Sequence, residues 1–178
     1  MIPLRISSLK TSDYWPTHIV IHHTAEDGVP ETFKFDNSKF QTGLLQTKKY
    51  QLTKNPNTKY NIIIERIGDD FHPIMSQPLF TKCEWEDIPE EYHSSVHVGI
   101  LGDYDMDIPM TRLYLVLGFK VLFPLTRMFR LKVDRIVFHR DISNQDITCP
   151  GELFDLDKVR MFARRFRKQQ SLYRKSSS

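Results

Sequence analysis

Four short apolar segments constrain the fold of this chain more than any other feature. Each is rich in Ile and Val and has the length of a strand, which favours a buried place in a β-sheet. The segments cover residues 18–22, 60–66, 96–101 and 135–138. A turn signal at residues 68–70 predicts that residues 71–74 pair back on the second segment as a hairpin.

Longer apolar patterns predict helices between and after these strands. The stretch 111–129 is too long for a strand, and Pro124 should kink or split the helix that it forms. Apolar residues recur at helical spacing over 153–166, and residues 32–45 are expected to hold a short helix. Because strands and helices alternate along the chain, we expect an α/β fold in which helices pack against a central sheet.

Length and composition are those of one ordinary globular domain. The chain has 178 residues, of which 40% are hydrophobic and 26% are charged. Two cysteines, Cys83 and Cys149, are too few for a disulfide framework, and a metal role for one of them fits equally well. The most apolar stretch, residues 113–119, is far shorter than the ~20 residues that a membrane span needs. No secretory signal is visible at the N-terminus, so we expect synthesis in the cytoplasm.

The C-terminal part of the chain is strongly basic. Residues 158–178 carry eight Lys and Arg and no acidic residue, whereas the net charge of the whole chain is only +3. We therefore expect a globular domain over 1–166 and a basic, flexible tail over 167–178 that binds an anionic partner. The alternative is a solvated helix end, because cations are favourable near a helix C-terminus.

Three residues far apart in the sequence have the chemistry of a zinc site. His22 and His139 each end a predicted buried strand, and Cys149 lies in the loop after the second of them. Strand ends in one sheet can converge on one ion, and two imidazoles with one thiolate leave one tetrahedral position open, which is typical of catalytic zinc. His22 and His23 should face opposite sides of the sheet, but periodicity alone does not decide between them.

The sequence resembles the type-2 family of zinc-dependent N-acetylmuramoyl-L-alanine amidases, which includes phage lysins and peptidoglycan recognition proteins. The resemblance lies in IHHTA at 21–25, YNIII at 60–64, FHRD at 138–141 and TCPG at 148–151, in the family's order. It implies the family's mixed β-sheet flanked by helices. It also implies one zinc ion held by His22, His139 and Cys149, with Tyr60 assisting catalysis.

One position departs from the family pattern. Members commonly carry Lys or Thr two residues before the cysteine, where this chain has Ile147, and Asp146 or Thr148 are the candidates to compensate. Asp141 is expected to be a turn residue, with a salt bridge to Arg140 or a hydrogen bond to a ligand imidazole as alternatives. The acidic run over residues 84–91 is interpreted as a surface loop.

The resemblance implies an amidase that cuts peptidoglycan between N-acetylmuramic acid and L-alanine, either as a phage endolysin or as a bacterial enzyme that works on internalised wall fragments. The chain is expected to be a monomer that acts on the wall when it is released or delivered, and its basic tail is expected to contact anionic wall polymers. The alternatives are a peptidoglycan-binding module without catalysis and a zinc hydrolase that acts on another amide.

Overall fold

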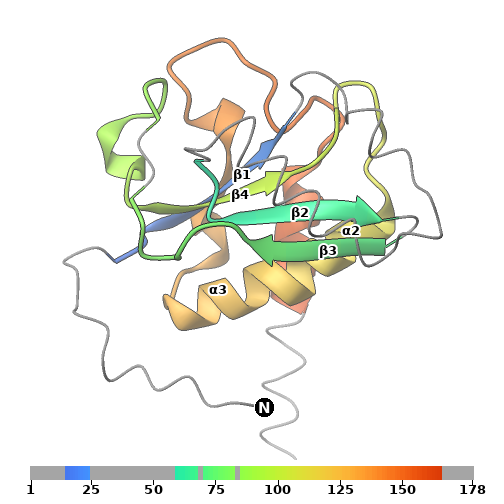
Figure 1. The fold of residues 1–178 in the computed structure, drawn as a ribbon, viewed down its shortest axis with the longest axis horizontal. Helices are drawn as coiled ribbons and strands as arrows, with labels where there is room; N and C mark the ends of the chain where they lie inside the picture. The colour runs from blue at the N-terminus through green and yellow to red at the C-terminus, as the bar shows by residue number, and fades with distance from the viewer. Residues whose placement is uncertain (1–14, 25–58, 68–69, 83–84, 166–178) are drawn as a thin grey trace, which may run out of the picture.

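The computed structural model describes residues 15–24, 59–67, 70–82 and 85–165. These residues contain a five-stranded sheet with helices packed against it (Figure 1). The strand order is β3-β2-β4-β1-β5. The strands are β1 (His18–His23), β2 (Ile62–Ile67), β3 (Asp70–Met75), β4 (Ser95–Ile100) and β5 (Ile136–Phe138). β1 runs parallel to both β4 and β5, β2 is parallel to β4, and β3 is antiparallel to β2. The expected mixed sheet is confirmed.

The predicted hairpin is also confirmed. β2 and β3 pair with Ile67 opposite Asp70, so two residues connect the strands. The short helix expected over 32–45, Cys83 and the tail over 167–178 lie outside the described residues. The division of the chain near residue 166 therefore stays a prediction.

One long helical segment follows β4. It consists of α2 (Thr111–Val116), a π-helical stretch η5 (Leu117–Leu122) and α3 (Phe123–Met128). Pro124 neither splits nor visibly ends this segment, because it lies in the first turn of α3, directly after the π-helical stretch. Phe123 there donates its backbone N–H to the carbonyl of Gly118, so the hydrogen-bonding pattern changes before the residue that lacks a donor.

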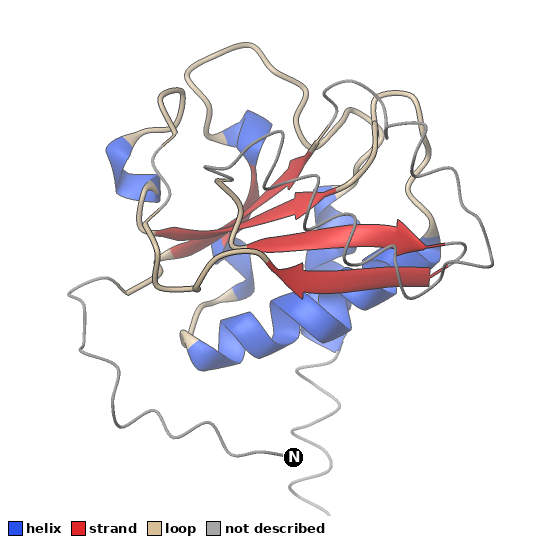
Figure 2. Cartoon of the chain, viewed as in Figure 1, coloured by secondary structure: helices blue, strands red, loops and turns tan. Residues whose placement is uncertain are grey.

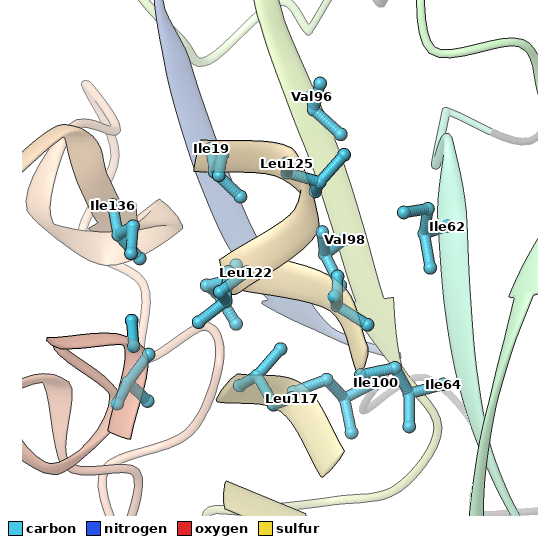
Figure 3. Packing of buried hydrophobic residues seen from close by; sticks show 14 of the residues in the cluster. Ile19, Ile62, Ile64, Val96, Val98, Ile100, Leu117, Leu122, Leu125 and Ile136 are labelled. Carbon is cyan, nitrogen blue, oxygen red and sulfur yellow. The ribbon is translucent and has the colours of Figure 1, made fainter. Parts of the chain in front are cut away.

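The two faces of the sheet differ. Ile19 of β1 faces the long helix, whose Leu117, Leu122 and Leu125 pack over the sheet (Figure 3). Ile21 belongs to the same core. Residues 156–165 form a further helix on this side, which adds Val159, Phe162 and Ala163 to the same core.

The opposite face carries a smaller apolar cluster and several buried polar groups. Val20 packs there against Ile88 and Ile142, from loops and short helical turns on that side of the sheet (Figure 2). Because side chains alternate along a strand, His22 points to the same face as Val20. Among the described residues, no helix combines the length and the apolar character needed to cross a membrane.

A pair of leucines tests the packing of the long helix. Leu122 is fully buried, whereas 42% of Leu115 on the same helical segment is exposed. Leu122→Ala should lower the free energy of unfolding by about 2–5 kcal/mol, because it leaves a cavity between helix and sheet. Leu115→Ala should change it by less than about 0.5 kcal/mol. Urea denaturation of both variants measures the difference, and equal losses would contradict the packing described here.

Candidate metal centre

His22 lies in the part of the sheet where β1 ends. Its side chain is fully buried, and the indole of Trp85 stacks on it with ring centroids 4.5 Å apart and an interplanar angle of 15°. The ring of Tyr60 flanks it at 5.5 Å. The Tyr60 and Trp85 rings also contact each other at 5.6 Å, so the imidazole belongs to an aromatic cluster on the face opposite the long helix.

The structure brings His139 and Cys149 to the same place. β5 pairs in parallel with β1, with Phe138 opposite Ile21, so the next residue is His139 on β5's side and His22, still within β1, on the other. One ligand atom from each of the three residues lies within 4.8 Å of the other two, and Cys149 Sγ is 3.9 Å from His22 Nδ1. Their role as zinc ligands stays a prediction, but their convergence is a property of the fold.

The Nε2 atom of each imidazole has a polar neighbour, as metal-binding histidines usually do, although only that of His22 meets hydrogen-bond geometry. His139 Nε2 lies 2.8 Å from a carboxylate oxygen of Asp87. His22 Nε2 lies 2.9 Å from Nδ1 of His97. Each contact leaves Nδ1 of the ring available to a cation. Since metal-binding histidines almost always use their other nitrogen in this way, the donor set fits a zinc ion.

Burial sets the protonation of these groups. It lowers the pKa of His22 well below its usual range, with further lowering by His97 and His139, and it lowers the pKa of His139 although Asp87 opposes the shift. Both imidazoles are thus neutral at neutral pH and keep a lone pair for a metal. Burial raises the pKa of the Cys149 thiol to about 12, against the effect of the hydrogen bond from the His23 backbone N–H. A cation at this position would favour the thiolate instead.

Arg140 holds the loop that carries Cys149. Its guanidinium donates hydrogen bonds to the backbone carbonyls of Thr148, Gly151 and Phe154, and its own backbone N–H donates to the carbonyl of Cys149 at 2.8 Å. Gly151 has φ of +106°, and a Cβ there would lie 2.4 Å from the carbonyl carbon of Tyr104. The loop conformation therefore requires glycine at this position.

Asp141 lies in a short helical turn, as expected of a turn residue, whereas the alternatives given for it, an Arg140 partner or a bond to a ligand imidazole, fall to other groups. Arg140 binds carbonyl oxygens, and Asp141 accepts a hydrogen bond from the backbone N–H of Phe138. The carboxylate at a ligand imidazole belongs to Asp87, from the run interpreted as surface loop. Burial of Ile88 against Val20 brings that run over the sheet, which sequence alone does not reveal.

Two residues were considered as replacements for the family's Lys or Thr, namely Thr148 and Asp146. Their environments differ. Thr148 donates its hydroxyl hydrogen to Asp105 at 2.8 Å, and Asp146 is exposed. The Thr148 hydroxyl therefore links the Cys149 loop to the segment after β4.

Tyr60 lies beside His22 because Gly99 of β4 leaves room for the Tyr60 ring. A Cβ on Gly99 would come within 2.8 Å of the Tyr60 ring, so the ring rests directly on the strand backbone. Gly99 pairs with His22, which explains why the phenol and the imidazole are neighbours. Catalysis by Tyr60 stays a prediction.

His23 belongs to a separate group on the other side of the strand end. One ligand atom of His23 lies within 4.8 Å of carboxylate oxygens of Asp103 and Asp105. These carboxylates accept hydrogen bonds from Thr148 and from the backbone N–H groups of Asp105 and Glu152, so they fix the two loops together. His22 and His23 thus diverge as alternation requires.

Sequence reasoning missed His97 and Trp85. His97 is fully buried between Val96 and Val98, which face the helix side, so alternation along β4 was the available signal that it faces the site. Trp85 contacts the rings of both His22 and His97, but no local pattern marks it.

Comparisons with known proteins support the fold through structure alone. No protein-family model matches the chain, and no curated protein sequence matches it. Among solved structures, N-acetylmuramoyl-L-alanine amidase LysC from Clostridium intestinale URNW is similar with a TM-score of 0.58 and 13% identity, over 84% of this chain and 85% of that one.

Two further structures show the same arrangement. A selenomethionine derivative of AmpD has a TM-score of 0.57 and 16% identity, over 84% of this chain and 86% of its own. Drosophila peptidoglycan recognition protein SD has a TM-score of 0.54 and 17% identity, over 79% and 76% of the two chains. The chain therefore has the fold of the type-2 amidases and peptidoglycan recognition proteins.

A substitution at Asp87 tests whether it supports a metal ligand. Asp87→Asn should weaken zinc binding by about 10–100-fold, because the carboxylate no longer orients His139. Glu86→Gln is the matched control, since Glu86 is exposed and adjacent in sequence. Competition with a zinc chelator measures both affinities. Equal affinities of the two variants would show that Asp87 does not support the ligand.

The raised pKa of Cys149 predicts how zinc binding depends on pH. The thiol is protonated in the metal-free protein at neutral pH and the imidazoles are neutral, so zinc should displace about one proton. The association constant should then rise about tenfold per pH unit between about pH 6 and 8. Calorimetry of zinc binding in two buffers of different ionisation enthalpy measures the number of protons released per zinc ion. Release of none, or of two, would contradict this protonation pattern.

Proposed function

We propose that this chain is a zinc-dependent amidase that cleaves peptidoglycan between N-acetylmuramic acid and L-alanine. The observation that carries the proposal is the convergence of His22, His139 and Cys149 within 4.8 Å on a fold shared with amidases. The sequence motifs that resemble the type-2 family supply these same three residues. The chain covers most of the length of the similar structures, which supports a whole catalytic domain.

His22, His139 and Cys149 would hold the ion. Bound there, zinc supplies a Lewis acid that activates water and polarises the scissile carbonyl. Asp87 and His97 keep the two imidazoles oriented, and burial of the rings keeps them neutral.

The remaining neighbours act on the substrate side. Tyr60, half-buried with its ring 5.5 Å from that of His22, would donate its phenol hydrogen to oxygen that gains negative charge as the amide carbon becomes tetrahedral. Trp85 stacks on His22 next to Tyr60, with the Trp85 and Tyr60 ring centroids 5.6 Å apart, and limits the access of bulk water. Lys59 lies over the Trp85 ring, with Nζ 5.3 Å from the ring centroid, and brings a positive charge close to this aromatic wall.

A peptidoglycan-binding module without catalysis is the second candidate. The observation that favours it is Ile147, where the family commonly has a polar side chain that stabilises developing charge. The engagement of the Thr148 hydroxyl by Asp105 favours it further, because that hydroxyl is held in a structural contact. Such a module would bind wall fragments and release no product.

Digestion of purified peptidoglycan separates the two candidates. The zinc-loaded wild type should free stem peptides with a new L-alanine amino terminus, detected by mass spectrometry. Cys149→Ala should lose both zinc and activity. Tyr60→Phe should keep zinc and lower the rate by about a hundredfold, because one donor to the oxyanion is gone.

Tyr92→Phe is the matched control, since Tyr92 packs against His18 at 4.7 Å, at the other end of β1. It should leave both zinc and rate unchanged. Binding of fragments without any release would support the module. Full activity of Tyr60→Phe would remove Tyr60 from the mechanism.

A further inference from the structure

His97 and His22 form a buried imidazole pair on the face of the sheet opposite the long helix, which we call the site face. Nδ1 of His97 lies 2.9 Å from Nε2 of His22, and neither residue is exposed to solvent. The two residues come from adjacent parallel strands, β4 and β1, where Val20 is the register partner of His97. The contact is therefore diagonal between neighbouring strands, and it approaches His22 from the side away from Cys149.

The position of His97 is fixed from several directions. Its backbone N–H donates to the side-chain oxygen of Asn61 at 2.8 Å, and its carbonyl accepts from the backbone N–H of Asn61 at 2.9 Å. The Asn61 side chain in turn donates to the carbonyl of Pro78. Trp85 stacks on both imidazoles, at 5.7 Å from His97 and 4.5 Å from His22. The pair is thus a rigid unit.

The location of one proton decides what this pair can do. The two rings face each other nitrogen to nitrogen at 2.9 Å, so one of these two nitrogens donates a hydrogen and the other accepts it. If His97 Nδ1 carries the hydrogen, it donates to His22 Nε2, and His22 Nδ1 must then carry the hydrogen of that ring. If His97 Nδ1 is the acceptor, His22 donates from Nε2, and its Nδ1 has a free lone pair.

The surroundings of Nδ1 of His22 favour the second arrangement. Cys149 Sγ lies 3.9 Å from this nitrogen and equally far from the carbonyl oxygen of His23. The thiol hydrogen therefore has another acceptor, and the lone pair on Nδ1 matters for a cation held between Nδ1 and Sγ. A cation between the two atoms needs the same lone pair.

We propose that His97 is a positioning residue that accepts the Nε2 hydrogen of His22 and so directs the Nδ1 lone pair of His22 toward Cys149. This inference rests on the proposed zinc site. The two ligand imidazoles then have different neighbours. His139 contacts the anionic carboxylate of Asp87, and the more deeply buried His22 contacts a neutral imidazole. A neutral acceptor suits His22, because a second carboxylate there would be a buried charge without water.

The first test needs no substitution and no metal. Long-range ¹H–¹⁵N spectra of the metal-free protein, labelled at histidine, report which nitrogen of each ring carries the hydrogen. His22 should be protonated at Nε2 and unprotonated at Nδ1. Protonation of His22 at Nδ1 would overturn the proposal.

The second test compares two substitutions at His97 by zinc competition. His97→Asn places an amide oxygen close to the position of Nδ1 and should retain the affinity within about threefold. His97→Leu removes the acceptor and should weaken zinc binding by about 10–100-fold. His18→Asn is the control, since His18 lies on the same face of β1 but contacts Thr17 and Arg135. Affinity of His97→Leu equal to that of His97→Asn would overturn the proposal.

These readouts are separate from catalysis. A zinc-loaded wild type that binds the metal in this way but releases nothing from peptidoglycan would contradict the proposed function alone. A fully active wild type with His22 protonated at Nδ1 would contradict the role of His97 alone.

Discussion

The parallel pairing of β1 with β5 is the constraint on which the site depends. Parallel neighbours end at the same edge of a sheet, so the residues that follow Ile21 and Phe138 become neighbours although 116 positions separate them in the chain. The helix side of both strands is filled by isoleucine, leucine and phenylalanine, which fixes their register. A shift by one residue would turn His22 into the helix-side core.

The site face of the sheet concentrates polar groups where little water reaches them. His22 and His97 are fully buried and His139 is nearly so, and burial holds all three neutral while it holds the Cys149 thiol protonated. Neutral imidazoles and a thiol in a dry environment form a soft donor set with lone pairs that converge. Such a set is suited to zinc, and it is poorly suited to the harder cations that prefer oxygen.

Much of this arrangement could be predicted from the sequence, because local patterns report burial. Runs of β-branched residues located four strands to within about two residues, and a turn signal located the hairpin of β2 and β3. The three candidate ligands could be named because strand ends in one sheet tend to converge, and the family resemblance selected His22 over His23.

The remaining features depend on contacts that have no local signal. Asp87 reaches His139 only because Ile88 is buried in the small cluster on the site face. A salt bridge between Arg140 and Asp141 was one alternative, yet the geometry of the Cys149 loop directs Arg140 to three carbonyls. Pro124 was expected to kink or split the helix, and it lies in a helical segment that continues past it and changes from π to α directly before it.

X-ray absorption at the zinc edge of the loaded protein tests the central claim most directly, because it identifies the atoms bound to the ion. The account predicts one sulfur scatterer at about 2.3 Å with nitrogen or oxygen scatterers at about 2.0–2.1 Å, and loss of the sulfur contribution in Cys149→Ser. A wild-type spectrum without sulfur would contradict the convergence of His22, His139 and Cys149 on one ion.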